Sequence, residues 1–230
     1  MEDDLAELLT ATGLACRLFP EQTQGPYHRD VHPERRDVTE DCDGLPLRLG
    51  LRFLTPDTSA PLSGVLVEVW QADRDGRYSG FQPFRAQPGQ VVTSESVPHE
   101  IVAARETFLR GAQRTDERGM CAFTTIYPGW YASRTVHIHL IAHLSEHTVT
   151  TQLYFPDDVT DDVFTYPPYR SRPPRDTTNP TDSIFLGGGD QTLLNVTGDP
   201  MTGFTGVLRL ALDPHAQPVS AADASPEGQA

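Results

Sequence analysis

Short stretches in which apolar and polar residues alternate recur along this chain, and they predict β-strands. The clearest is LPLRLGLRFL, residues 45–54, where every second side chain is apolar up to Phe53. Successive side chains of a strand point to opposite faces, so this alternation is typical of a strand with one buried face. GVLVEVW, residues 64–70, has fewer polar positions and predicts a more fully buried strand.

A turn signal separates the next two runs of strand-like sequence. FLRGAQRT, residues 108–115, and MCAFTTI, residues 120–126, flank the tetrapeptide DERG. Asp at the start and Gly at the end of a tetrapeptide are typical of a tight reverse turn. We therefore predict that the two runs form a β-hairpin.

Three further runs follow in the C-terminal half. EHTVTTQLYF, residues 146–155, alternates and places Gln152 and Tyr154 on one face of a strand. TLLNVT, residues 192–197, and GFTGVLRLAL, residues 203–212, are separated by a Gly-Asp-Pro turn. Many short strands with turn signals between them indicate an all-β fold, a single β-sandwich domain.

Two long segments lack strand periodicity. Residues 82–107 contain several Pro and Gly residues and predict a long loop, at whose start Phe81 and Phe84 are candidate walls of a pocket. Residues 156–183 are rich in Pro, Asp, Thr and Arg, but they include aromatic side chains that need burial. We expect this second segment to be an ordered wrap over the sandwich that contains a helical turn.

The first residues predict a short helix. Leu5, Leu8 and Leu9 have helical spacing, and acidic residues precede them in the first turn, where they favour the helix dipole. We expect the helix to end near Gly13 and to dock on the sandwich.

The predicted organisation has three parts. Residues 1–19 contain the short N-terminal helix, residues 20–213 form the β-sandwich core with its long wrapping loops, and residues 214–230 form a flexible tail. The tail is predicted from its Pro, Ala, Ser and Gly content, which offers little to bury.

Charge and cysteine content exclude several classes of function. The chain has 18 basic and 32 acidic residues, for a net charge of -14, which argues against binding to nucleic acid or to an anionic membrane surface. Three scattered cysteines, Cys16, Cys42 and Cys121, do not suit a disulfide framework or a zinc ribbon. The acidic N-terminus and the absence of a long apolar stretch predict a soluble, cytoplasmic protein.

Candidate chemistry is concentrated in IYPGWYASRTVHIHL, residues 126–140. His137 and His139 are two residues apart in a predicted strand, so they project from the same face and can reach one metal ion. The Pro128-Gly129 turn puts Tyr131 on a loop that can fold back over that face. Each of these residues taken alone is more often a packing residue than a ligand.

A second stretch strengthens the metal hypothesis. The buried run that ends near Trp70 is followed by the turn signal Asp73-Arg74-Asp75-Gly76, and Tyr78 comes directly after it. The two histidines that follow the His-x-His pair, His143 and His147, are interpreted as surface or loop residues.

Five segments of the chain match a known protein family in the family's own order. They are Pro20–Asp30 (PEQTQGPYHRD), Val67–Phe81 (VEVWQADRDGRYSGF), Phe108–Tyr131 (FLRGAQRTDERGMCAFTTIYPGWY), Arg134–Leu140 (RTVHIHL) and Thr151–Asp158 (TQLYFPDD). On these segments the chain resembles the intradiol ring-cleavage dioxygenases, the family of protocatechuate 3,4-dioxygenase and catechol 1,2-dioxygenase. Members use non-haem ferric iron to cleave a catechol with O2 between its two hydroxylated carbons, which gives a cis,cis-muconate.

The resemblance implies a role for each matching residue. Tyr78, Tyr131, His137 and His139 correspond to the family's ligands for one Fe(III) per chain, and Tyr131 to the ligand that leaves when substrate binds. Arg134 matches an arginine that stabilises charge on the activated ring, and Gln152 a glutamine near it, so the implied catalytic residues are Arg134, Tyr131 and Gln152. Gly25, Pro26 and Tyr27 match a segment that lines the substrate pocket.

The chemistry of ferric iron independently suits these donors. A tyrosine binds a metal as phenolate, and a hard, highly charged ion lowers its pKa from about 10 far enough for that. Two phenolates and one hydroxide neutralise a charge of three, which keeps a buried site electrically balanced. A catechol dianion can replace the hydroxide and one phenolate without changing that balance.

Two alternatives remain open from the sequence. A non-catalytic β-sandwich module that binds carbohydrate or another ligand would hold no iron. A ferrous extradiol dioxygenase commonly uses two histidines and one carboxylate, whereas no acidic residue follows the His pair before Glu146. The sequence leaves open the catechol preferred and whether the chain forms a homo-oligomer. The acidic charge favours a neutral catechol over protocatechuate, unless Arg85, Arg105 or Arg110 lines the site.

Overall fold

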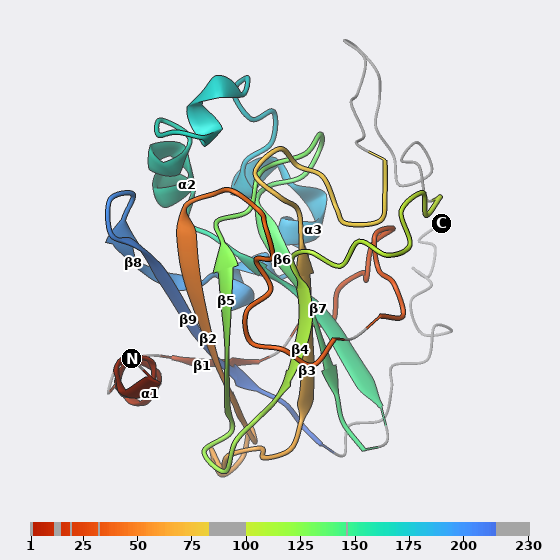
Figure 1. The fold of residues 1–230 in the computed structure, drawn as a ribbon. Coiled ribbons are helices and arrows are strands. Elements are labelled where there is room, and N and C mark those ends of the chain that lie inside the picture. Colours follow the sequence, from red (N-terminus) through yellow and green to blue (C-terminus); the bar gives the residue numbers. More distant parts are fainter. Residues whose placement is uncertain are drawn as a thin grey trace, which may run out of the picture.

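Two stacked β-sheets form the body of the computed structural model, with short helices at one end and on one outer face (Figure 1). It describes residues 2–11, 15–18, 20–31, 33–82, 100–145 and 147–214. The strands are β1 (Cys16–Leu18), β2 (Pro46–Leu54), β3 (Leu66–Gln71), β4 (Arg110–Arg114), β5 (Met120–Ile126), β6 (His137–His143), β7 (Thr148–Tyr154), β8 (Asn195–Asp199) and β9 (Gly203–Ala211). The α-helices are α1 (Glu2–Thr10), α2 (Asp157–Val163) and α3 (Ser183–Leu186), and the 3₁₀ helices are η2 (Tyr169–Ser171), η3 (Asn179–Thr181) and η4 (Gly189–Thr192).

The five-stranded sheet has the order β1-β9-β2-β5, with β8 paired to β9. In it β9 runs parallel to both β1 and β2, whereas β5 is antiparallel to β2. The four-stranded sheet has the order β4-β3-β6-β7 and is antiparallel throughout. The predicted all-β sandwich with a short N-terminal helix is therefore confirmed.

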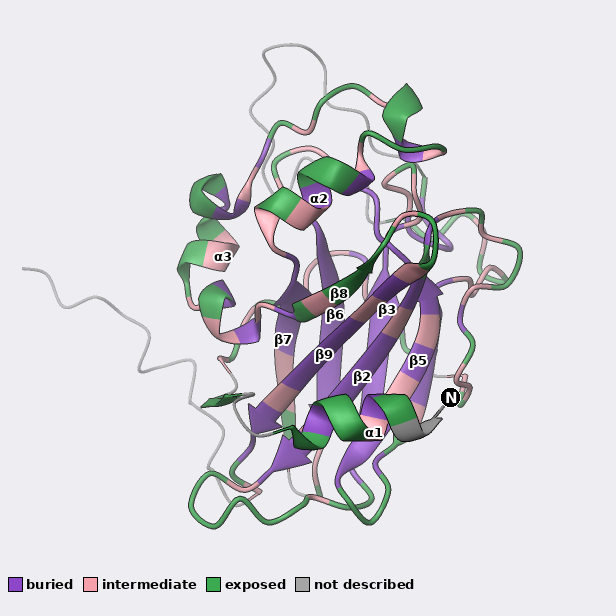
Figure 2. Cartoon of the chain, turned by 90° about the vertical axis from the view of Figure 1, so that its left-hand side faces the viewer, coloured by how far each residue is buried: buried purple, intermediate pink, exposed green. Residues whose placement is uncertain are grey.

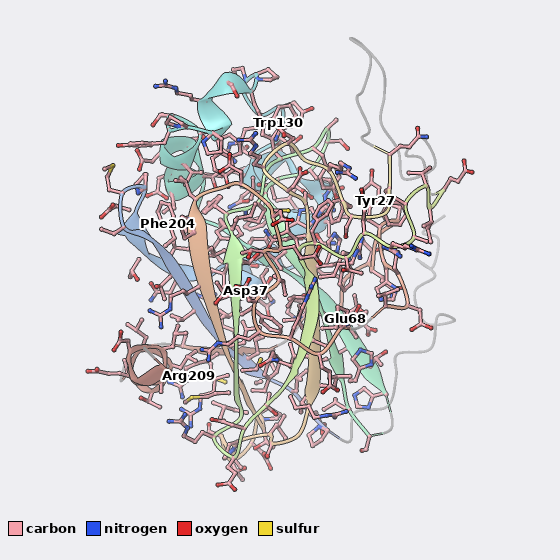
Figure 3. The ribbon with its side chains drawn as sticks, in the orientation of Figure 1. Tyr27, Asp37, Glu68, Trp130, Phe204 and Arg209 are labelled. Carbon is pink, nitrogen blue, oxygen red and sulfur yellow. The ribbon has the colours of Figure 1, made fainter. Side chains whose placement is uncertain are left out.

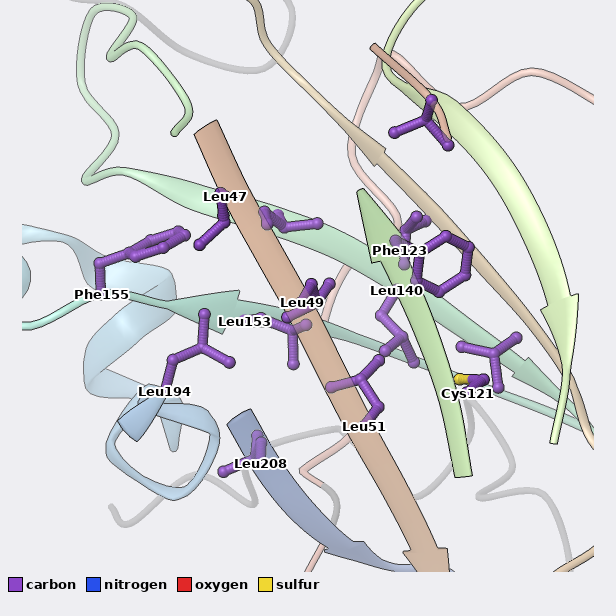
Figure 4. Close-up of a cluster of buried hydrophobic side chains, with 14 of the residues drawn as sticks. Leu47, Leu49, Leu51, Cys121, Phe123, Leu140, Leu153, Phe155, Leu194 and Leu208 are labelled. Carbon is purple, nitrogen blue, oxygen red and sulfur yellow. The ribbon is translucent and has the colours of Figure 1, made fainter. Parts of the chain in front are cut away.

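The core lies between the two sheets. Leu47, Leu49 and Leu51 of β2 point into it, toward Leu140 of β6 and Leu153 of β7, and all five side chains are at most 1 % exposed (Figure 4). The alternation read in residues 45–54 thus marks the buried face of β2. Truncating one of these leucines to alanine typically costs about 2–5 kcal/mol of stability.

The predicted hairpin over residues 108–126 is wrong. The turn itself forms, because Gly119 N–H donates to the Asp116 carbonyl at 2.9 Å. However, β4 pairs with β3 in one sheet and β5 pairs with β2 in the other, so the turn crosses between the layers. A local turn signal does not say which sheet the second strand joins, and here both strands bury one face in the shared core.

The segment that follows β7 is ordered, as predicted, and wraps one end of the sandwich. It contains α2, which lies where the sequence predicts a helical turn. Tyr169 is fully buried, and its hydroxyl donates to the Tyr127 carbonyl at 2.5 Å. Asn179 Nδ2 donates to the Phe155 carbonyl at 2.9 Å, so the wrap is tied to the strands through buried hydrogen bonds.

Helix α1 lies across the outer face of the five-stranded sheet (Figure 2). Leu5 and Leu9 are buried there against Met120 and Val207, whereas Leu8 is 37 % exposed. Gly50 of β2 leaves room for the helix, because a Cβ at that position would lie 2.9 Å from Leu5 Cδ2. The helix therefore docks on the sandwich as predicted, and two of its three leucines make the contact.

Some predicted features lie outside the described residues. They are the end of the first helix at Gly13, Phe84 and Arg85 in the long loop, Glu146, and the tail beyond residue 214. None of the helices in the described part of the chain is both long and apolar enough to span a lipid bilayer.

Candidate metal centre

One row of residues across the outer face of the four-stranded sheet forms the base of the candidate site. The strand registers place in this row Arg110 of β4, Trp70 of β3, His139 of β6 and Gln152 of β7. Tyr27 and Glu68, labelled in Figure 3, lie on the same side of the sandwich, opposite to Phe204 and Arg209 of β9. The inner face of the same strands belongs to the core, so the core holds the row in place.

His137 and His139 project from one face of β6, as the alternation predicts. Their Nε2 atoms are 3.1 Å apart, and the two side chains are 2 % and 0 % exposed. The His139 ring stacks on Trp70, with centroids 4.7 Å apart and planes at 6°. Gly25 covers it closely, because a Cβ there would lie 3.1 Å from His139 Cε1. Packing therefore fixes the orientation of this imidazole.

Tyr78 reaches the histidines from the turn after β3. Asp73 N–H donates to the Arg77 carbonyl at 2.8 Å, which closes the turn that the sequence signals. The Tyr78 hydroxyl then lies 3.1 Å from His139 Nε2, and its side chain is 2 % exposed.

Tyr131 approaches from the loop between β5 and β6. This loop rests on the turn that carries Tyr78, because Gly129 N–H donates to the Asp73 carbonyl at 3.0 Å. Gly76, at φ 83°, is part of the contact, since a Cβ there would lie 2.2 Å from the carbonyl oxygen of Trp130. The Tyr131 hydroxyl lies 3.3 Å from His137 Nε2. Two loops far apart in the sequence thus deliver both phenols to one histidine pair.

The hydrogen bond at the far nitrogen of His137 identifies its tautomer. His137 Nδ1 lies 2.7 Å from the Thr135 carbonyl, which can only accept, so Nδ1 carries the proton and Nε2 presents a lone pair. For His139, Nδ1 is buried and has no hydrogen-bond partner among the described residues. Its Nε2 faces both His137 Nε2 and the Tyr78 hydroxyl.

Burial controls the protonation of all four groups. Burial, and then the charge of Arg134, lowers the pKa of His137 to about 3. Burial, and then His137, lowers the pKa of His139 well below its usual value. Burial raises the pKa of Tyr78 and of Tyr131, although the charge of Arg134 partly opposes this for both. The imidazoles are therefore neutral at neutral pH, and the phenols stay protonated unless a strong positive charge lies beside them.

This donor set suits a hard, highly charged cation. Two imidazole nitrogens that meet one ion at about 2.1 Å lie roughly 3 Å apart, as these do. No three His, Cys, Asp or Glu side chains in the described residues gather as a metal site, so the candidate centre depends on its tyrosines. Phenolate oxygen is a ligand that ferric iron favours.

Arg134 lies directly beside this cluster. Its Nε donates to Asp182 Oδ2 at 2.8 Å, and its Nη2 donates to Gln152 Oε1. Its Nη1 points to the Tyr131 hydroxyl at 3.5 Å. Asp182 and Gln152 thus hold the guanidinium of Arg134, and its remaining nitrogen points to the phenol of Tyr131. The structure brings the three sequence-predicted catalytic residues, Arg134, Tyr131 and Gln152, together.

Asp182 is a residue of this site that the sequence interpretation missed. Its side chain is fully buried, and besides Arg134 it accepts a hydrogen bond from Thr135 N–H at 2.8 Å. Its other oxygen accepts from the N–H groups of Ile184 and Phe185 at the start of α3. An Asp before a short apolar run is a helix-capping signal, but that signal does not point to an arginine 48 positions away.

The segment of Gly25, Pro26 and Tyr27 also lies at the site. Tyr27 stacks on Tyr78 with ring centroids 4.4 Å apart, and its ring meets that of Tyr131 edge-on at 5.8 Å. Pro26 is half-buried between its two neighbours. Gln152 Nε2 donates to the Thr23 carbonyl at 3.1 Å and so ties this segment to β7.

The other residues considered from the sequence lie elsewhere or have different partners. His143, at the far end of β6, lies 3.3 Å from Glu68 Oε2 and is 30 % exposed. Arg105 is exposed, whereas Arg110 is buried in the same row as His139, at its β4 end.

Comparison with known proteins gives consistent matches. A family model described as Dioxygenase matches residues 23–166. An intradiol ring-cleavage dioxygenase from Tetranychus urticae is 31% identical, with a TM-score of 0.76, over 88% of this chain and 97% of that one. The dioxygenase domain of a dioxygenase and carbohydrate-binding protein fusion from Streptomyces sp. SirexAA-E is 29% identical, with a TM-score of 0.59, over 85% and 98%. The 3-chlorocatechol 1,2-dioxygenase of Rhodococcus opacus shares the fold, at 20% identity and a TM-score of 0.54, over 90% of this chain and 74% of that one.

Proposed function

The chain belongs to the intradiol ring-cleavage dioxygenase family, and we propose on that premise that it is a non-haem Fe(III) enzyme that cleaves a catechol-type ring with O2 between the two hydroxylated carbons, giving a cis,cis-muconate. One observation carries the proposal. The hydroxyls of Tyr78 and Tyr131 and the Nε2 atoms of His137 and His139 meet in one buried cluster, with neighbouring donor atoms 3.1–3.3 Å apart. These four residues would hold one ferric ion per chain.

When bound, ferric iron supplies the positive charge that ionises both phenols and the catechol, and it withdraws electron density from the ring so that O2 can attack it. The residues around it divide the remaining tasks. Tyr78 is covered by Tyr27 and stays in place as a permanent phenolate. Tyr131 is the most exposed of the four donors, at 8 %, and it comes from a loop, so it is the ligand suited to leave.

Tyr131 is then a built-in base. Its phenolate oxygen accepts one proton of the entering catechol, and a hydroxide accepts the other, so that the charge of the site does not change. Arg134 Nη1, 3.5 Å from that oxygen, is placed to stabilise the phenolate before substrate binds and the negative charge on the ring afterwards. Gln152 holds the guanidinium, and its own Oε1 also accepts from the Tyr154 hydroxyl at 3.0 Å.

A non-catalytic binding module explains the same cluster less well. If His137 and His139 merely packed, the proton of His139 would have to lie between the two buried Nε2 atoms, 3.1 Å apart, because that of His137 is already used at Nδ1. A shared cation relieves that arrangement and also uses both phenols.

The test of this proposal is colour, iron and oxygen uptake in one preparation. Phenolate bound to ferric iron absorbs visible light, so we expect a red-brown protein with about one iron per chain that consumes O2 when catechol is added. The product should show the ultraviolet absorption of a muconate. A colourless protein that stays free of iron after loading with ferrous salt in air would contradict the proposal. A panel of catechol, hydroxyquinol and protocatechuate identifies the substrate.

Asp182→Asn provides a second, more local test. Asparagine keeps the shape and one acceptor oxygen but removes the charge that orients Arg134. We expect iron and colour to be retained and turnover to fall roughly 10- to 100-fold, since a misplacement of about 1 Å costs about that much. Asp158→Asn, an exposed acid on α2, is the control and should behave as the wild-type protein. Unchanged turnover in Asp182→Asn would remove its positioning role.

A further inference from the structure

Arg110 is a buried cation beside the candidate metal centre. Its side chain is 2 % exposed, and none of the described acidic residues forms an ion pair with it. Its Nε donates to Ser79 Oγ at 2.7 Å, and its Nη2 donates to the carbonyls of Tyr27 and Ser79 at 2.8 and 3.1 Å. Its Nη1 is buried without a hydrogen-bond partner among the described residues.

The surroundings of Arg110 make its charge costly. A second buried guanidinium, that of Arg29, lies nearby and donates to the carbonyls of Ala104 and Glu106. Burial, and then the charge of Arg29, lowers the pKa of Arg110 to about 10, so it is still protonated at neutral pH. Negative charge on Tyr78 or Glu68 would act in the opposite direction. A buried charge without an ionised partner is unfavourable, and it is retained where another task requires it.

We propose that Arg110 is the buried counter-charge of the Tyr78 phenolate and a clamp that keeps the rings of Tyr27 and Tyr78 stacked. This inference rests on the proposed function, because Tyr78 becomes an anion only as a ligand. The positive charge is held at the residue next to Tyr78, by the hydrogen bonds of Arg110 to the Ser79 hydroxyl and carbonyl. The hydrogen bonds of Arg110 go to Ser79 and Tyr27 and not to any of the four metal donors, so it is a positioning residue.

The clamp follows from the two chain segments that one guanidinium joins. Tyr27 belongs to the segment before β2, and Ser79 adjoins Tyr78 in the segment after β3, yet both bind Arg110. The rings that these segments carry stack at 4.4 Å. Loss of the planar guanidinium, with its several hydrogen bonds, should loosen this ring stack. Loss of the positive charge should instead change the energy of the electrons that the Tyr78 phenolate donates.

The two effects can be separated because lysine keeps the charge and glutamine removes it. A positive charge near a phenolate lowers the energy of its donor electrons. Without that charge, the transfer of an electron from phenolate to ferric iron requires less energy, so the visible band moves to longer wavelength. Without the charge, the Tyr78 phenol also holds its proton more strongly, so the metal competes less well with the proton for this oxygen. Iron should then be lost to a chelator faster, by roughly tenfold or more.

The experiment compares Arg110→Gln and Arg110→Lys as iron-loaded full-length proteins. We expect the visible band of Arg110→Gln at longer wavelength than that of the wild-type protein, with faster iron loss to a chelator. Arg110→Lys should keep the wild-type band position even if its melting temperature falls. Arg114→Gln is the control, since this arginine lies on the same strand, is 58% exposed and is 3.7 Å from Glu34. Its band should not move.

The outcomes distinguish this inference from the function on which it rests. A coloured wild-type protein with the same band in both Arg110 variants would overturn the counter-charge role while leaving the dioxygenase proposal intact. Equal shifts of the visible band in the glutamine and lysine variants would show that only the clamp matters, which would also overturn the counter-charge role. A wild-type protein without iron or colour would overturn both.

Discussion

His139→Ala is expected to abolish iron binding, and with it the colour and the ring-cleavage activity. This imidazole is the centre of the donor cluster, because its Nε2 lies 3.1 Å from both His137 Nε2 and the Tyr78 hydroxyl. Changes in residues that only support a metal ligand typically cost about 10–100-fold in affinity, so loss of a ligand should cost more. His137→Ala should have the same effect.

Iron per chain and visible absorbance measure this directly. Alanine leaves a cavity between Trp70 and Gly25 that has the shape of the lost ring, so added imidazole should restore part of the colour. His143→Ala is a matched control, because it lies on the same face of β6 but away from the donors, beside Glu68. A His139→Ala protein with full iron and full colour would show that the ion, if bound, is held elsewhere.

Arg134→Ala is expected to keep its iron and colour while turnover falls roughly a hundred- to a thousand-fold. Removing one preorganised electrostatic donor typically costs about 3–4 kcal/mol in the transition state. The guanidinium is fixed by Asp182 and directed to Tyr131, so it needs no rearrangement as charge develops. Lysine should be a poor replacement, because a point ammonium cannot donate to three groups in the same plane.

The comparison that decides the role of Arg134 is turnover per bound iron. Steady-state rate and iron content should be measured on the same preparation, beside Arg170→Ala as a control at an exposed arginine. The control should match the wild-type protein. If turnover per iron in Arg134→Ala were also unchanged, Arg134 would be a structural partner of Asp182 and its catalytic role should be withdrawn.

The parts of the fold that could be predicted from the sequence are those set by neighbours in the chain. The alternation of residues 45–54 predicted both β2 and its buried face, and the His-x-His spacing placed two imidazoles on one side of β6. The turn after β3 was predicted from Asp73 and Gly76, and it forms. In each case the pattern and the structure that it specifies lie within about ten residues of each other.

The pairing of strands and the partners of the site residues required the tertiary structure. The turn before Met120 was correctly located, but its two strands join different sheets. Asp182 carries the local signal of a helix cap, and nothing near it in the chain indicates its partner Arg134. Arg110 has the pattern of an ordinary strand residue, and nothing near it indicates its partner Ser79.

By itself, then, the sequence determined which side chains share a face, where turns fall and which residue types are present, because dihedral preferences and side-chain alternation act over a few residues. The resemblance to a family added the roles of Tyr78 and Tyr131, which no local pattern provides. Only the tertiary structure decided that these phenols meet the histidine pair, that Asp182 orients Arg134 and that the buried Arg110 binds Ser79, next to Tyr78. Those contacts join residues up to 61 positions apart, and they exist because burying the faces of two sheets on one core brings the loops at their edge together.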